Sequence, residues 1–218
     1  NECDALFWVF DVNAGTVNKS SPKIIKENLT AVHTSLEIVE DKARVSKIEK
    51  LDENDANTFV TVNDVRMHNG IIEVDVCGKL RDDAPDYARG FIGIVFRVNE
   101  GNNEFESFYI RPTNGIGCDD PVRKAHGCQY FSYPGYTFSY FREYGIAKYE
   151  NQVDTIALNE WSHIKAVIED EHADFYVDDI HVLRVDDLKH GDSQGKFGFY
   201  VDIGTDGYFK NLQYTCTD

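Results

Sequence analysis

Short segments in which apolar and polar residues alternate recur along the chain, and turn residues separate them about every ten positions. Residues 71–76 alternate without a break, and residues 161–169 place Ile164, Ala166 and Ile168 on one face. Alternation with period two is the pattern of a strand with one buried face, and this rhythm is typical of a sandwich or barrel. Helix signals are limited to residues 21–29 and 119–126. The pattern predicts an all-β antiparallel sandwich of two sheets.

The segments run from one end of the chain to the other without a repeat or a Pro- or Ser-rich linker between them. We therefore expect a single domain over residues 1–218. Its first and last strands should be neighbours, which would place Phe7, Trp8 and Phe10 near Leu212 and Tyr214. We also expect Trp161, at the start of an alternating segment, to be largely buried.

The charge balance limits the partners of the chain. Its 218 residues include 38 Asp and Glu but only 22 Lys and Arg, which gives a net charge of −16. Nucleic acids and anionic membranes are themselves negative, so neither is expected as the main partner. No apolar run approaches the ~18 residues that a membrane-spanning helix needs. The acidic surface favours a neutral ligand over a polyanion.

Five cysteines, an odd number at wide spacings, do not form a disulfide framework. The simplest interpretation is free thiols in a reducing compartment, which favours a cytoplasmic location. Cys77 in particular has no near partner in sequence. A Cys118–Cys128 bridge stays open, and Cys3 could meet Cys216 if the terminal strands pair. Secretion is the alternative if a leader once preceded Asn1.

Several patterns resemble functional motifs but lack the required context. Residues 191–195 match G-x-S-x-G, yet a polar segment precedes Ser193 and a strand follows, whereas a nucleophile elbow needs a strand before it and a helix after it. Four histidines lie nine residues apart, a spacing that fits strands and turns rather than a zinc site: His163, His172, His181 and His190. Paired aspartates are favoured at turns, and a structural Ca²⁺ ion in one of these loops is a candidate: Asp82–Asp83, Asp119–Asp120, Asp178–Asp179 and Asp186–Asp187.

A polar and aromatic set around residues 97–130 is the main candidate site. If Phe108 and Ile110 face the core, Tyr109 and Arg111 project from the other face, and Arg97 on the preceding strand joins them. Guanidinium groups, amides and rings of this kind bind sugar hydroxyls and the apolar faces of sugars. The irregular residues 112–160 would fold over this concave face and complete the site. The substrate-binding candidates are Tyr109, Asn114, Asp120, Arg123, Gln129 and Glu143, and the catalytic candidates are His126, Arg111 and Arg97, with Glu150 as an alternative acid.

The same segments resemble a known superfamily. Residues 161–165, 175–178, 195–199 and 208–212 are similar to the closing meander of concanavalin A-like, or laminin G-like, jelly rolls. Residues 93–97 and 108–111 resemble its 3-keto-disaccharide hydrolase-like branch, and residues 109–115 and 129–130 resemble an uncharacterised bacterial subgroup. The resemblance implies a two-sheet jelly roll whose concave face binds saccharide.

Three functions are compatible with this set of residues. The first is a glycoside-cleaving enzyme, with a 3-keto-glycoside as one candidate substrate: His126 would act as the base, and Arg97 and Arg111 would stabilise the enolate. The second is a non-catalytic module that binds a saccharide or a protein. The third is a structural interaction domain, in which surface carboxylates pair with both arginines and no cavity exists. The depth of the site distinguishes the three functions: an enzyme needs a pocket with converging titratable groups, a binding module has a shallow groove lined by aromatic residues, and a structural domain has no cavity.

Overall fold

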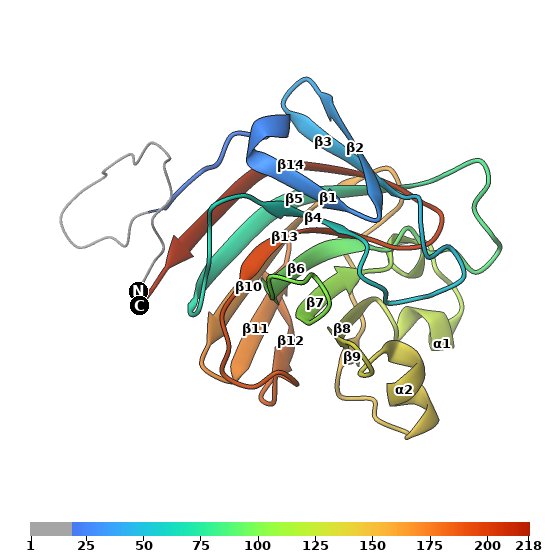
Figure 1. Cartoon of the computed structure of the whole chain (residues 1–218). Helices are drawn as coiled ribbons and strands as arrows, with labels where there is room; N and C mark the ends of the chain where they lie inside the picture. The colour runs from blue at the N-terminus through green and yellow to red at the C-terminus, as the bar shows by residue number, and fades with distance from the viewer. Residues whose placement is uncertain (1–18) are drawn as a thin grey trace.

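The computed structural model describes residues 19–218 and contains two seven-stranded antiparallel sheets (Figure 1). The first sheet has the strand order β1 (Leu29–Val32), β4 (Phe59–Val62), β13 (Lys196–Val201), β6 (Ile92–Val98), β7 (Phe105–Ile110), β8 (Cys128–Tyr133) and β9 (Glu150–Asn151). The second has the order β12 (Ile180–Val185), β11 (His172–Val177), β10 (Trp161–Glu169), β5 (Gly70–Leu80), β14 (Thr205–Cys216), β3 (Lys42–Lys47) and β2 (Thr34–Val39). The predicted antiparallel sandwich is confirmed.

The helices are short: η1 (Lys26–Asn28), η2 (Pro112–Asn114), α1 (Pro121–Lys124) and α2 (Phe138–Glu143). Figure 1 places α1 and α2 together at one end of the sandwich, beyond β8 and β9. Within residues 19–218, none of these helices has the length and apolar character to cross a membrane.

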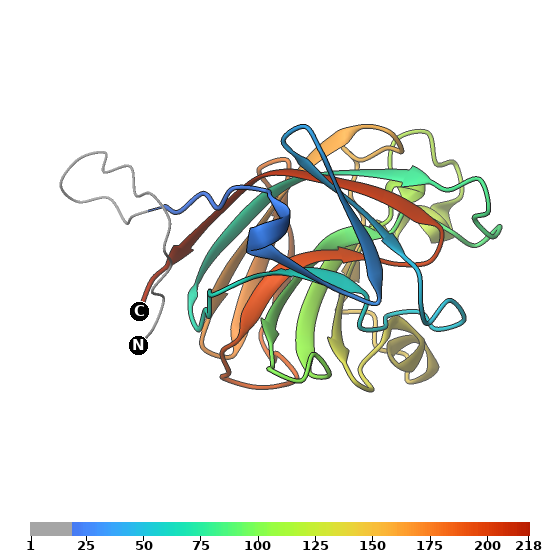
Figure 2. The same cartoon turned by 45° about the horizontal axis from the view of Figure 1, so that its top comes forward.

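The main core lies between the two sheets. Phe108 of β7 stacks on Phe175 of β11, with ring centroids 4.4 Å apart, and Phe199 stacks on Phe209 at 4.5 Å. The predicted inward positions of β10 are buried, as alternation requires. Burying each large apolar side chain contributes about 1.5–3 kcal/mol, so this layer is the chief source of stability. In the turned view of Figure 2, β14 and β5 run side by side along the sandwich, in agreement with their antiparallel pairing.

A second aromatic cluster occupies the other face of the first sheet, the face that the sequence predicted as an open binding surface. Residues 50–58 cover it: the side chain of Asp55 accepts a hydrogen bond from Tyr109 Oη at 2.9 Å, and Lys50 lies over the ring of Tyr133. Tyr109 is only 1% exposed. The middle of this face is therefore interior, and the expectation that Tyr109 reads a ligand there is wrong. The cluster consists of Phe59, Phe91, Val95, Val98, Phe105, Tyr109, Phe131 and Tyr200.

A β-bulge in β6 explains why Arg97 does not join Tyr109 and Arg111. Lys196 of β13 pairs with Val98 whereas Gly198 pairs with Val95, so β6 has one extra residue there, and Arg97 takes a positive φ of 51°. Val98 consequently takes the outward position that strict alternation assigned to Arg97. The predicted grouping of the two arginines on one face is wrong for this reason.

Two further expectations need correction. Trp161 is 38% exposed rather than buried, because it shares the outer face of β10 with the odd-numbered positions, and Lys210 Nζ lies 4.0 Å from its ring centroid. Cys77, Cys118 and Cys128 are free thiols, as expected for Cys77, but Cys216 is disulfide-bonded. The simple picture of free thiols throughout therefore does not hold. Cys3, Phe7, Trp8 and Phe10 lie outside the described residues.

Candidate functional site

Arg111 is the anchor of the site, at the point where β7 ends and η2 begins. Its Nη2 donates to the Tyr109 hydroxyl at 3.2 Å and to Gln129 Oε1 at 3.1 Å, and its Nη1 donates to the His126 carbonyl at 3.2 Å. The guanidinium also lies over the rings of Tyr109 and Phe138. Contacts on both faces and edges hold this side chain in one position, and it is 4% exposed.

Glu150 of β9 collects three basic groups beside Arg111. Its Oε1 lies 3.4 Å from Arg111 Nη2 and 3.1 Å from Arg142 Nη2, and its Oε2 lies 2.8 Å from His126 Nδ1. Arg142 comes from α2, and Glu150 pairs with Gln129 in the sheet. Burial lowers the pKa of His126, and Arg142 and Arg111 act in the same direction against the attraction of Glu150. His126 is therefore mostly neutral near pH 7.

A cavity of about 220 Å³ opens over these groups. We call it the arginine pocket. Four guanidinium groups, one imidazole and three aromatic rings line it, and none of its lining residues carries a carboxylate. The lining consists of Asn54, Tyr87, Arg89, Phe91, Arg111, Asn114, Val122, Arg123, His126, Phe138 and Arg142.

Two of the four arginines have only neutral partners. Arg123, from α1, donates through Nε to Asn114 Oδ1 at 3.3 Å and through Nη2 to Thr113 Oγ1 at 3.1 Å. Arg89 donates through Nη1 to the carbonyls of Asp86 at 2.8 Å and Ala88 at 3.0 Å. Among residues 19–218, no carboxylate forms an ion pair with either side chain. Burial lowers the pKa of Arg89, and the nearby charges of Arg123 and Arg111 lower it further.

The pocket brings together only part of the predicted site. Arg111, Asn114, Arg123 and His126 line it, and Tyr109 and Gln129 lie buried beneath Arg111, which they hold in place. Asp120 and Glu143 also lie outside the lining. The side chain of Asp120 caps α1 by accepting from the amides of Val122 and Arg123, and Glu143 is exposed at the end of α2.

Sequence reasoning missed most of the pocket wall. Arg89, Phe91, Phe138 and Arg142 line the cavity, yet they come from two separate segments, residues 89–91 and α2, whose packing no periodicity reveals. The one available signal was composition, because residues 112–160 are rich in aromatic residues. Glu150, the alternative acid, is the carboxylate that lies beside Arg111.

Arg97 belongs to a different cluster at another place in the fold. It is 4% exposed and donates to the carbonyls of Gly191 at 2.9 Å and His68 at 3.2 Å, and to Asn69 Oδ1 at 3.4 Å. Asp192 lies 4.0 Å away. These acceptors satisfy the guanidinium within the protein. Arg97 therefore ties loops together, and it does not reach the arginine pocket.

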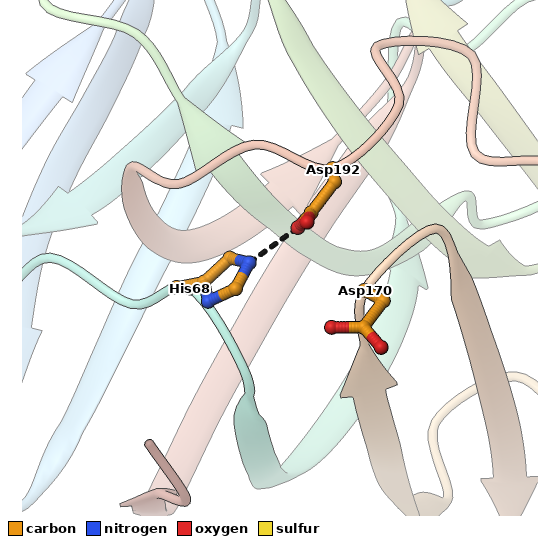
Figure 3. Close-up of side chains that lie close together, drawn as sticks. All are labelled: His68, Asp170 and Asp192. Carbon is orange, nitrogen blue, oxygen red and sulfur yellow. Dashed lines mark hydrogen bonds and ion pairs between the residues drawn. The ribbon is translucent and has the colours of Figure 1, made fainter.

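His68, Asp170 and Asp192 form the one group among residues 19–218 whose ligand atoms are close enough to hold a metal ion, within 4.8 Å of one another (Figure 3). However, His68 Nε2 pairs with Asp192, and its Nδ1 pairs with Asp218. The hydrogen bond with Asp192 is the main cause that raises the pKa of His68. Carboxylates thus engage both ring nitrogens of His68, and a protonated imidazole has no free electron pair for a metal. The cluster includes none of the paired aspartates considered for Ca²⁺.

A larger hollow, of about 450 Å³, lies beside β3, β5 and β14. Its charged side chains satisfy one another: Arg44 Nε lies 2.9 Å from Asp206 Oδ1, and Arg81 Nε lies 2.9 Å from Asp83 Oδ1. The remaining charged residue of its lining is an acid, Asp82, and no aromatic ring lines it. The arginine pocket is the smaller of these two spaces, but it combines three aromatic rings with an excess of positive charge.

Comparison with solved structures finds other two-sheet β-sandwiches of similar fold, whereas no protein-family model and no curated protein matches the sequence. The carbohydrate-binding module CBM66 from Bacillus subtilis superposes with a TM-score of 0.59 at 17% identity, over 86% of this chain and 95% of that one. A B. subtilis protein of unknown function with a galectin-like fold gives 0.55 at 9% identity, over 87% and 89%. The GH43 protein BlXynB from Bacillus licheniformis gives 0.53 at 13% identity, over 90% of this chain and 38% of that one. The chain thus has a concanavalin A-like jelly-roll fold.

Proposed function

We propose that the protein binds a saccharide in the arginine pocket and does not hydrolyse it. The observation that carries this proposal is the lining: three aromatic rings and several fixed hydrogen-bond donors converge, and no carboxylate is among them. Rings pack against the apolar face of a sugar, and guanidinium and amide groups bind its hydroxyls. Hydrolysis of a glycosidic bond ordinarily needs two carboxylates that flank the bond.

Two observations support binding over the alternatives. Glu150 is the only carboxylate paired with a basic side chain of the pocket among residues 19–218, and two arginines and His126 already engage it. A structural interaction domain would have no cavity here, whereas the pocket is present. One protein of similar fold is itself described as a carbohydrate-binding module.

A blocking substitution tests the proposal without disturbing the buried network. Val122 lines the pocket from α1 but is 69% exposed, so Val122→Trp fills the opening at little cost in stability. Ile180→Trp, on a 54% exposed residue of β12, is the matched control. Screening by calorimetry against a panel of mono- and oligosaccharides should find a ligand whose binding Val122→Trp abolishes and Ile180→Trp preserves. Equal binding by both variants would place the saccharide site elsewhere.

A second candidate function is the elimination of an aglycone from a 3-keto-glycoside. The observation that favours it is His126, a mostly neutral imidazole that lines the pocket: in the tautomer whose Nδ1–H donates to Glu150 Oε2, the Nε2 atom carries the free electron pair and has no hydrogen-bond partner among residues 19–218. His126 would remove the proton beside the ketone, and the electron pair of that C–H bond would form the enolate. Collapse of the enolate would break the bond to the aglycone, which leaves with a proton from water. Arg123 would stabilise the enolate oxygen.

Incubation with a 3-keto-glucoside separates the two functions. Under the elimination mechanism, His126→Asn lowers turnover by about 10²-fold or more. Under the binding proposal, the aglycone is released no faster than in buffer, and His126→Asn changes affinity little because the neighbouring donors remain.

A further inference from the structure

We infer that the ligand of the arginine pocket is an acidic saccharide, in which a carboxylate or an ester sulfate on the sugar meets the guanidinium groups of Arg89 and Arg123. This inference rests on the proposed function, because it names the class of saccharide that the same pocket takes. The net charge of −16 means that the molecule as a whole favours a neutral ligand. An acidic ligand therefore requires a local excess of positive charge at the pocket.

The four guanidinium groups of the pocket are not balanced by acids. Arg111 and Arg142 share Glu150, whereas Arg89 and Arg123 have only carbonyl, hydroxyl and amide acceptors. The acidic residues beside them in sequence do not help: Asp86 offers Arg89 its carbonyl, and the carboxylate of Asp120 is occupied with the amide groups of α1. The pocket therefore carries a positive excess inside an acidic protein.

Holding like charges together without a counter-charge costs free energy, and the charges of Arg123 and Arg111 add to the effect of burial in lowering the pKa of Arg89. Arginine presents a planar set of donors that matches a carboxylate or a sulfate better than it matches a single hydroxyl. An anionic group between Arg89 and Arg123 would relieve the repulsion and would accept hydrogen bonds from both.

The rest of the lining specifies a sugar rather than a bare anion. Tyr87, Phe91 and Phe138 give the pocket apolar surface that a small inorganic ion cannot use, and Asn54 and Asn114 offer amide groups for hydroxyls. The volume of about 220 Å³ suits a single sugar ring. The acidic exterior does not prevent binding, because charges more than about 8 Å away are largely screened at physiological salt.

The test compares acidic sugars with their neutral counterparts by calorimetry. The carboxylate probes are glucuronic, galacturonic and mannuronic acid, each against glucose, galactose or mannose. Glucose 6-sulfate and inorganic sulfate separate a sugar ester from a free ion. We expect at least one acidic sugar to bind at least about 10-fold more tightly than its neutral partner, since hydrogen bonds to charged groups are the stronger ones. Raising the salt concentration should weaken the binding of the acidic sugar and leave the binding of the neutral sugar unchanged.

Substitutions assign the effect to the two arginines. Arg89→Gln and Arg123→Gln should each lower affinity for the acidic sugar by about 10- to 100-fold, and by a larger factor than they lower affinity for the neutral sugar. Arg184→Gln is the matched control, because Arg184 is an exposed arginine of β12 that pairs with Asp174 and Asp186. Thermal unfolding of each variant shows whether it is folded, and the salt dependence of the unmodified protein gives a measurement that needs no variant.

The outcomes distinguish this inference from the proposed function. If a neutral sugar binds as tightly as the acidic one and Val122→Trp blocks both, the protein binds saccharide but the acidic class is wrong. If none of the sugars binds in a way that Val122→Trp affects, the proposed function itself fails. Inorganic sulfate that binds as tightly as glucose 6-sulfate overturns the inference, because the sugar ring would then contribute nothing.

Discussion

Arg97 lies on β6, and Arg111 directly follows the neighbouring strand β7 of the same sheet. Both side chains are 4% exposed, and yet their hydrogen-bond partners differ in kind. The acceptors of Arg97 are mostly backbone carbonyls, so its cluster is closed upon itself. Arg111 shares a single carboxylate with two other basic groups and borders a cavity. A buried arginine is therefore not by itself a sign of a binding site. The sign is an excess of charge that the protein leaves unmatched beside an open space.

Removal of Arg111 should have the largest effect on stability. Arg111→Ala takes a donor from Tyr109, Gln129 and the His126 carbonyl and leaves buried polar groups without partners. We expect the free energy of unfolding to fall by about 3–5 kcal/mol, measured by urea denaturation. Arg184→Ala, on the exposed strand β12, should change it by less than about 0.5 kcal/mol. Equal small losses in both variants would contradict the anchoring role.

The pocket end of the molecule should also respond to pH through Asp55. Burial raises the pKa of Asp55 to about 7, and the neighbouring Asp202 contributes, whereas the ordinary value is 3.8. Between about pH 4 and about pH 7 the folded protein keeps a proton that the unfolded chain has released, so stability falls as the pH rises. The fall across this window is as much as about 4 kcal/mol.

Asp55→Asn tests this origin, because the amide can still accept from the amide of Phe138 and donate to Tyr109 Oη. Stability curves of the two proteins from pH 4 to pH 8 should diverge, with the variant gaining relative to the unmodified protein as the pH rises. Parallel curves would show that Asp55 is ionised throughout.

Substitution by glutamine should separate the two kinds of arginine directly. Arg97→Gln loses several buried hydrogen bonds and should cost about 1–3 kcal/mol. Arg123→Gln loses only partners at the edge of the pocket and should cost less than about 0.5 kcal/mol. Chemical denaturation of both variants measures the difference. A larger loss of stability for Arg123→Gln than for Arg97→Gln would contradict the assignment of Arg97 to a structural cluster and of Arg123 to an open pocket.

The smallest expected effect is at His68, beside Arg97. Its pKa is raised, so its pairing with Asp192 contributes stability that is complete below about pH 6.5 and is lost as the pH rises through the higher folded value. The groups are partly exposed, which limits the contribution to about 1 kcal/mol or less. Thermal unfolding from pH 6 to pH 9 should show this loss in the unmodified protein and not in His68→Asn.

The sequence was informative where one periodicity governed a whole strand. Alternation placed Phe108 and Ile110 in the core and Tyr109 on the opposite face, and the sandwich followed from such segments. Alternation failed at Arg97, because one extra residue in β6 moves the side chains that follow it to the opposite face of the sheet. Trp161 was misjudged although its own alternation with Ile164 already placed it outside.

The pocket could not be derived in the same way. Arg89, Phe138 and Arg142 meet Arg111 only through the packing of irregular segments, where neither period two nor the helical period applies. The same limit explains why Glu143 was named ahead of Glu150: both lie in the irregular stretch, and only the pairing of β9 with β8 brings Glu150 beside Gln129.

The cover over the outer face of the first sheet limits the shape of any ligand. A linear polymer that lies across a sheet needs an open groove several rings long, and here residues 50–58 and the aromatic cluster occupy that surface. If the proposed function holds, we therefore expect a saccharide chain to enter the arginine pocket through its terminus or a short side branch. Under the proposed function, the amount of protein bound to a polysaccharide would depend on its number of chain ends and not on its chain length.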